Sequence, residues 1–171
     1  MIGAPEIIAA IIGATSTGAF TLIDRIRTRK RRAESVLTAL AAEVRSILDL
    51  IEHQRYAEAI SEQATLVRAG SWGGRSYIID VRSDYFSVYN SLTAELGLLQ
   101  PDQVQKVVAF YAYCKSAIDS TRPDGPFADG VDQHEALEYF QSLEGLFAAI
   151  KMVGEHIITM PKHPIAPALT A

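Results

Sequence analysis

The feature that most constrains this chain is an uncharged run near its N-terminus, followed at once by a dense basic cluster. The run covers 17 residues from Ile7 to Ile23, and Glu6 and Asp24 bound it. As a helix it would rise about 25 Å, slightly less than the ~30 Å hydrocarbon core of a bilayer. The residues before Glu6 supply the missing length at the headgroup level. The pattern therefore predicts a single membrane-spanning helix within residues 1–24.

The basic cluster predicts the topology of this helix. A secretory signal peptide has its positive charge before the apolar run, whereas here the charge follows it, and no convincing small-x-small cleavage site precedes the cluster. We therefore expect an uncleaved anchor with its N-terminus outside and the remaining chain in the cytoplasm. The juxtamembrane segment 25–32 is expected to set this topology and to contact anionic lipid through six residues, Arg25, Arg27, Arg29, Lys30, Arg31 and Arg32.

The rest of the chain is acidic. Six of the 16 Lys and Arg residues and two of the 20 Asp and Glu residues precede residue 33, so residues 33–171 carry a net charge of −8. This charge would repel nucleic acid, and the position of the basic cluster after an apolar run favours lipid as its partner. The single cysteine, Cys114, excludes a disulfide within the chain and is interpreted as a small buried side chain.

The expected membrane helix has two unlike faces. Its Ile and Leu residues share one arc of a helical wheel, whereas Ala, Gly, Ser and Thr occupy most of the remainder. The small residues form a predicted packing face, and three of them follow small-xxx-small spacing. This face predicts self-association of the helix through Ala9, Gly13, Ser16 and Thr17. Two alternatives remain open: small residues are common in all membrane helices, and the segment is also compatible with an interfacial or soluble helix packed inside a complex.

Residues 33–160 are expected to form an all-α bundle of about four helices, the first continuous with the anchor. No glycine or proline interrupts residues 19–69, which favours one long helix leaving the membrane. Apolar residues there step alternately by three and four, typical of a coiled-coil seam or of the core-facing stripe of a bundle helix. This stripe consists of Leu37, Leu40, Val44, Ile47 and Ile51.

Punctuating residues divide the remainder of the bundle. A break is expected at 71–75, a connector at 77–81, a helix from about Asp84 to Leu98, another beginning at Pro101, and a loop at 120–130. Asp132 is the expected N-cap of the last helix. The buried face of that helix is predicted to contain Ala136, Phe140, Leu143, Phe147, Ile150, Val153 and Ile157. The Pro-rich tail at 161–171 is expected to be extended.

No motif specifies a reaction, so no catalytic residue, cofactor or metal is expected. The Glu-x-x-His pairs of di-iron bundles and the Gly-x-Ser-x-Gly motif of serine hydrolases are missing from the sequence. His134, Glu135 and Glu138 lie on one helix face, but solvation explains them better than a metal. A weaker alternative is an enzyme whose site is assembled between helices from these residues or from tyrosines.

The general plan resembles small single-pass helical proteins of bacterial phage defence, including CRISPR-associated accessory proteins with a helical nuclease-like domain. The RNase motif of that helical family, Arg and His separated by four to six residues, is missing, since seven residues separate Arg45 from His53. We therefore expect a non-enzymatic interaction or oligomerisation protein at the cytoplasmic face, forming a homo-oligomer or joining a membrane complex. The alternative is an oligomeric pore or membrane-perturbing effector, with Ser16, Thr17 and Thr21 lining a lumen.

Overall fold

The computed structural model describes the backbone of residues 4–74, 84–122 and 132–161, and within these ranges the side chains from Ile23 onward. The described residues form helices and no strands, which confirms the all-α prediction. The elements are α1 (Ala4–His53), α2 (Tyr56–Arg68), α3 (Ser87–Leu92), a 3-10 helix η1 (Thr93–Leu98), α4 (Pro101–Thr121) and α5 (Gln133–Thr159). The expected connector at 77–81 and the tail after Pro161 lie outside the described residues.

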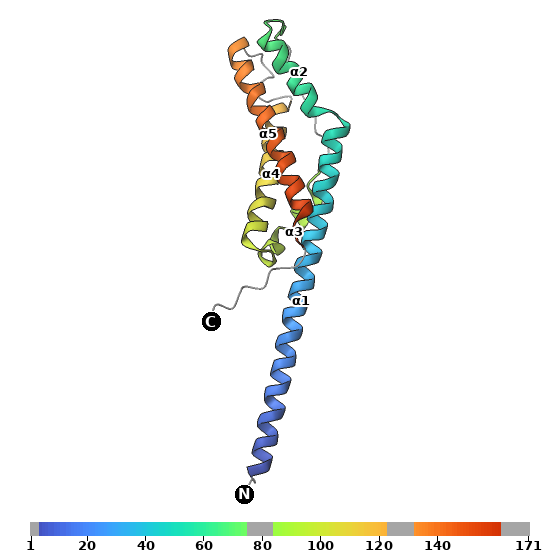
Figure 1. Ribbon diagram of the computed structural model, residues 1–171, viewed down its shortest axis with the longest axis vertical. Coiled ribbons are helices and arrows are strands. Elements are labelled where there is room, and N and C mark those ends of the chain that lie inside the picture. Colours follow the sequence, from blue (N-terminus) through green and yellow to red (C-terminus); the bar gives the residue numbers. More distant parts are fainter. Residues whose placement is uncertain (1–3, 75–83, 123–131, 162–171) are drawn as a thin grey trace.

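Helix α1 is one continuous helix of 50 residues and the longest element. Its C-terminal half forms one wall of the bundle, while its N-terminal part extends away from the other helices (Figure 1). The heptad-spaced residues face the core, so they form the core-facing stripe of a bundle helix, to which Val36 also belongs. Val36, Leu37, Leu40, Val44 and Ile47 are buried, and Ile51 is half-buried.

No helix in the described part of the chain is long and apolar enough to cross a membrane. The uncharged run from Ile7 lies within α1, but its side chains up to Leu22 are outside the described residues. The same holds for the predicted packing face of Ala9, Gly13, Ser16 and Thr17.

The long helix favoured by the uninterrupted run at 19–69 is present as α1, but it ends at His53 and α2 begins at Tyr56. Arg55, between them, has a left-handed backbone with φ of 54°. For a residue other than glycine this conformation costs roughly 1–2 kcal/mol. The turn lets α2 pack against α5 with Ile60, Ala64 and Val67 buried, and that apolar burial offsets the local cost.

Helix α5 is the centre of the bundle and packs against α1, α2 and α4. Asp132 is its N-cap, as predicted, because its carboxyl group accepts hydrogen bonds from the backbone N–H groups of His134 and Glu135. The predicted core face of α5 is confirmed, with all of its seven residues buried except the half-buried Val153. Gly154 lies on this face where Leu48 and Phe110 approach α5 closely.

Two further expectations need correction. The single helix predicted from Asp84 to Leu98 is instead the short α3 followed by η1, both packed on α1. Helix α4 begins at Pro101 as predicted but continues to Thr121, two residues into the expected loop.

Candidate functional site

The segment 25–32 of α1 is the most highly charged surface of the described chain, and all six of its basic side chains are exposed. Successive helical residues are rotated by about 100°, so these six side chains surround the helix rather than form one stripe. Such a collar of positive charge can meet negative groups from any direction around the helix axis.

Arg32 differs from the other five basic residues, because it contacts the bundle. Its Nε donates to Oε2 of Glu95 at 2.8 Å and its Nη2 donates to Oε1 at 2.9 Å. This hydrogen-bonded pair holds the pKa of the Glu95 carboxyl below its ordinary value and raises the pKa of Arg32. Both oxygens of the Glu95 carboxylate are engaged, so the pair gives η1 a defined contact with α1. The contact lies four residues before Val36, the first buried residue of α1. The sequence grouped Arg32 with the lipid-facing residues; the structure gives it a partner 63 positions away.

Two exposed isoleucines lie within or next to the basic collar. Ile23 is 45% exposed and Ile26 is 59% exposed. Ile23 and Ile26 are three residues apart, and Ala33 and Leu37 follow Ile26 after seven and eleven residues. At this helical spacing the two isoleucines lie on the same face of α1 as the residues buried in the bundle. This part of α1 therefore exposes large apolar side chains between arginines that surround the helix, and both residue types occur in helices at membrane interfaces.

A second polar arrangement is buried and was not anticipated from the sequence. Glu43 of α1 is 9% exposed, and its carboxyl oxygens accept hydrogen bonds from the backbone N–H groups of Val88 at 2.7 Å and Tyr89 at 2.9 Å. The hydroxyl of Tyr111 donates a third bond to the same group at 2.6 Å. Burial and this hydrogen bond raise the pKa of Tyr111 far above its ordinary value. Glu43 thus caps the N-terminus of α3 from another helix.

The Glu43 arrangement is structural rather than catalytic. Three donors already occupy its carboxyl oxygens, and aromatic rings enclose Tyr111: Tyr89 stacks on it at 3.9 Å between ring centroids, and Phe86 and Phe110 meet it edge-on. No sequence pattern signals this role, because a glutamate beside a core stripe is usually solvated. Only the folding of α3 over α1 brings its donors to Glu43.

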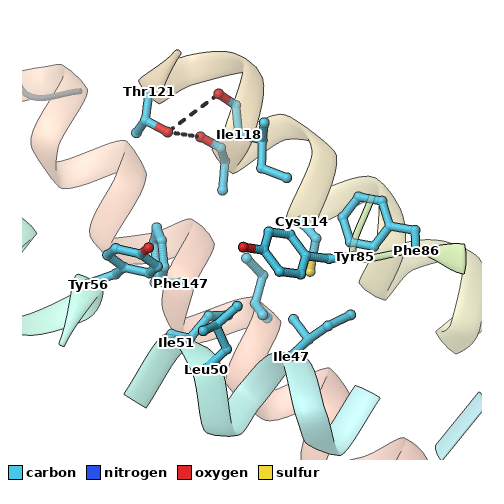
Figure 2. A pocket seen from close by; sticks show the side chains of 12 residues that line it. Ile47, Leu50, Ile51, Tyr56, Tyr85, Phe86, Cys114, Ile118, Thr121 and Phe147 are labelled. Atoms are coloured by element: carbon cyan, nitrogen blue, oxygen red, sulfur yellow. Dashed lines mark hydrogen bonds between the residues drawn. The ribbon is translucent and has the colours of Figure 1, made fainter. Parts of the chain in front are cut away.

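An apolar pocket lies beneath the turn between α1 and α2 (Figure 2). Ile51 and Tyr56 line it from either side of the turn, and Cys114 lines it from α4. Cys114 is buried, as its interpretation as a core residue predicted, and burial raises the pKa of its thiol to about 12. The thiol is therefore a poor nucleophile at neutral pH.

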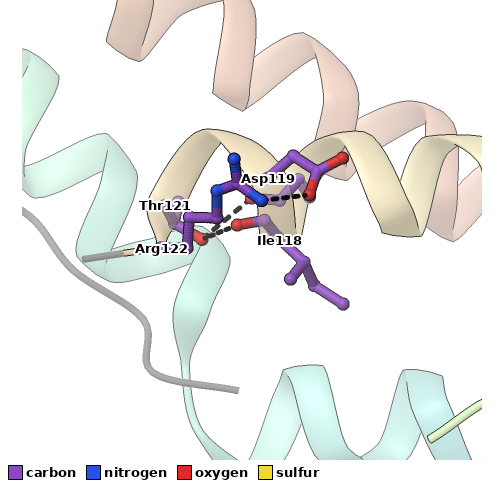
Figure 3. Close-up of polar contacts among 5 residues, drawn as sticks. Ile118, Asp119, Thr121 and Arg122 are labelled. Atoms are coloured by element: carbon purple, nitrogen blue, oxygen red, sulfur yellow. Dashed lines mark hydrogen bonds and ion pairs between the residues drawn. The ribbon is translucent and has the colours of Figure 1, made fainter. Parts of the chain in front are cut away.

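The polar groups at the C-terminal end of α4 serve the helix itself. The hydroxyl of Thr121 donates to the backbone carbonyls of Ala117 and Ile118, and Arg122 pairs with Asp119 at 3.5 Å (Figure 3). The Thr121 hydroxyl thus engages backbone carbonyls in the last turns of α4.

His134, Glu135 and Glu138 lie in the first two turns of α5. The Nε2 of His134 lies 3.7 Å from Oε1 of Glu138, and both side chains are more than 70% exposed. Within the described ranges no group of three His, Cys, Asp or Glu residues is placed to hold a metal ion. The backbone N–H groups of His134 and Glu135 donate to Asp132, so this region works as a helix start.

Comparison with known proteins adds no relative: no family model matches the chain, and neither a curated protein nor a solved structure matches it.

Proposed function

We propose that this chain is a single-pass, membrane-anchored helical protein that acts at the cytoplasmic face by binding other subunits, not by catalysis. The observation that carries the proposal is the continuity of α1 from Ala4 to His53. The uncharged run, the basic collar and the core stripe of the bundle all belong to this one helix. An anchor built in this way holds the folded bundle rigidly, because no flexible linker separates the two.

The spacing along α1 suits this role. Asp24 ends the uncharged run, and Val36 is the first buried residue of the bundle. The two positions are twelve residues apart, which corresponds to about 18 Å of helix. The exposed arginines occupy this interval, where the headgroups of a bilayer would lie. Positive charge at that level attracts anionic lipid and retains the bundle on the cytoplasmic side.

The charge of the bundle supports the proposal that self-association occurs through the anchor. In each copy, residues 33–171 carry a net charge of −8, so two copies repel each other. The small-residue face of Ala9, Gly13, Ser16 and Thr17 instead allows close helix contact. We therefore place the contact between copies in the anchor, which leaves the acidic bundle free to bind partners.

Membrane fractionation tests the anchor. The wild-type chain is expected to remain with membranes after a carbonate wash and to dissolve only in detergent. The double variant Ile8→Asp/Ile12→Asp is expected in the wash, because a carboxylate at the bilayer centre is costly. Leu66→Asp is the matched control, since Leu66 is an exposed apolar residue on α2. Release of the wild type by carbonate would overturn the proposal.

Cysteine labelling tests the orientation. Met152 is 66% exposed, and the native Cys114, which is buried, is replaced by alanine so that one cysteine reports the orientation. Met152→Cys in a Cys114→Ala background should resist a membrane-impermeant maleimide in intact cells and react after lysis. Labelling in intact cells would place the bundle outside and contradict the proposed topology.

A further inference from the structure

The apolar pocket beneath the turn between α1 and α2 has no part in the proposed anchoring function. Its volume is about 60 Å³, and residues from α1, α2, α4, α5 and the turn before α3 line it. In Figure 2, Tyr56 and Phe147 lie on one side of the hollow, Tyr85 lies on the other, and Ile51 and Leu50 lie below. The walls therefore come from elements that are distant in sequence.

The lining contains no charged side chain, which excludes an ionic ligand. The Thr121 hydroxyl donates to backbone carbonyls within α4, and the Cys114 thiol is a weak donor. The polar groups of the lining that can hydrogen-bond to a ligand are the hydroxyls of Tyr56 and Tyr85. The hydroxyl of Tyr85 points into the hollow (Figure 2). Burial and the proximity of Tyr85 raise the pKa of Tyr56, so this side chain stays a neutral donor and acceptor at neutral pH.

The size of the pocket limits its occupant. A volume of 60 Å³ is about twice the share of one water molecule in the liquid, and an engineered cavity that holds benzene has about 150 Å³. The pocket thus accommodates a short alkyl chain rather than an aromatic ring. Along α1, Ile51 lies 19 residues from Arg32, or about 28 Å, so the pocket is remote from the basic collar. An occupant would therefore arrive from the aqueous phase and has to be water-soluble.

We propose that this pocket binds small, uncharged aliphatic alcohols, with the alkyl chain among the isoleucines and the hydroxyl group hydrogen-bonded to Tyr85. The apolar walls supply affinity, and the tyrosine hydroxyl supplies orientation. This binding is independent of the proposed anchoring function.

Methyl NMR of the isoleucine-labelled full chain in nanodiscs, titrated with alcohols from ethanol to 1-octanol, tests this proposal. Ile47, Ile51, Ile118 and Ile150 line the pocket and should shift, whereas the buried Ile60 and Ile157 do not line it and serve as internal references. Affinity should rise about fourfold per added methylene and stop rising once the pocket is filled. A continued rise through 1-octanol, or equal shifts at Ile60, would indicate partition into lipid or general binding and would overturn the proposal.

Two variants make the test specific. Ala117→Leu places a larger side chain in the pocket and should weaken 1-butanol binding at least tenfold, whereas the control Ala57→Leu, at an exposed position beside Tyr56, should not. If Ala117→Leu fails to fold, Tyr85→Phe decides, since Tyr85 is 39% exposed. Loss of its hydrogen bond should weaken 1-butanol binding about fivefold and leave 1-chlorobutane binding unchanged. Unchanged 1-butanol binding in Tyr85→Phe would refute the assigned orientation and the proposal with it.

Discussion

The hydroxyl of Tyr111 donates a 2.6 Å hydrogen bond to Glu43, and this contact joins α4 to the helix that extends out of the bundle. The same carboxyl group accepts the N–H groups of Val88 and Tyr89 at the start of α3. One side chain of α1 therefore fastens two other helices. Since Glu43 is buried, removal of a donor leaves part of its hydrogen-bonding capacity unsatisfied.

Tyr111→Phe is expected to lower the free energy of unfolding by about 2 kcal/mol, because a buried hydrogen bond to an acidic group is lost while the ring remains. Urea unfolding in detergent, followed by the fluorescence of the single tryptophan Trp72, measures this change. Tyr113→Phe is the matched control on the same helix, since Tyr113 is 37% exposed. Equal decreases in the free energy of unfolding in the two variants would show that the hydrogen bond to Glu43 does not stabilise the fold.

Alkaline pH should destabilise the fold through the same residue. The folded-state pKa of Tyr111 lies above its ordinary value of 10.0, mainly because of burial and then because of Glu43. Above about pH 10 the unfolded chain loses this proton while the folded chain keeps it, so the free energy of unfolding falls as pH rises. Urea midpoints at pH 8 and pH 11 should differ less in Tyr111→Phe than in the wild type, and Tyr113→Phe should behave as the wild type does.

Gly154 and Gly145 on α5 should respond oppositely to alanine. A Cβ atom at Gly154 would lie 2.9 Å from both Leu48 Cδ1 and Phe110 Cε2, whereas at Gly145 nothing lies within 4 Å. Gly154→Ala is therefore expected to destabilise the bundle by about 1–3 kcal/mol through overpacking. Gly145→Ala should stabilise it by about 0.5–1 kcal/mol through helix propensity. Thermal unfolding of both variants checks the pair, and a stabilised Gly154→Ala would contradict the close contact of α1, α4 and α5.

Cys114 should be nearly inert in the folded chain. Burial raises the pKa of its thiol from 9.0 to about 12, so the reactive thiolate is about a thousandfold scarcer than for an ordinary cysteine at pH 8. Labelling by a thiol reagent should therefore be slow without denaturant and should accelerate across the urea transition. Rapid labelling of the native protein would show that α4 opens without global unfolding.

Gly13→Leu should weaken self-association of the anchor, because a large side chain prevents close approach of two helices. The expected result is a shift of the detergent-solubilised particle from oligomer to monomer by mass measurement. Ile12→Leu, in the Ile/Leu arc of the helix, is the matched control and should leave the mass unchanged. A wild-type particle that is already monomeric would rule out this contact.

Sequence patterns were sufficient for elements whose cause is local. Pro101 starts α4 and Asp132 caps α5 because a ring-fixed φ angle and a side-chain acceptor act within one helical turn. The stripe from Leu37 to Ile47 identified the buried face of α1, since periodicity alone determines which side chains share a face. The uncharged run and the basic cluster likewise indicated the anchor that we propose.

The tertiary structure decided what depends on partners distant in the chain. Arg55 takes a left-handed conformation because burial of α2 against α5 offsets a local cost that no glycine relieves. Glu43 acquires its donors, and Arg32 its ion pair with Glu95, only when α3 and η1 pack on α1. The pocket between Tyr56 and Tyr85 exists only where four helices and a turn meet. Local patterns determined which residues form helices and which faces are buried. Long-range packing determined where α1 ends, which acid is buried and where the apolar pocket lies.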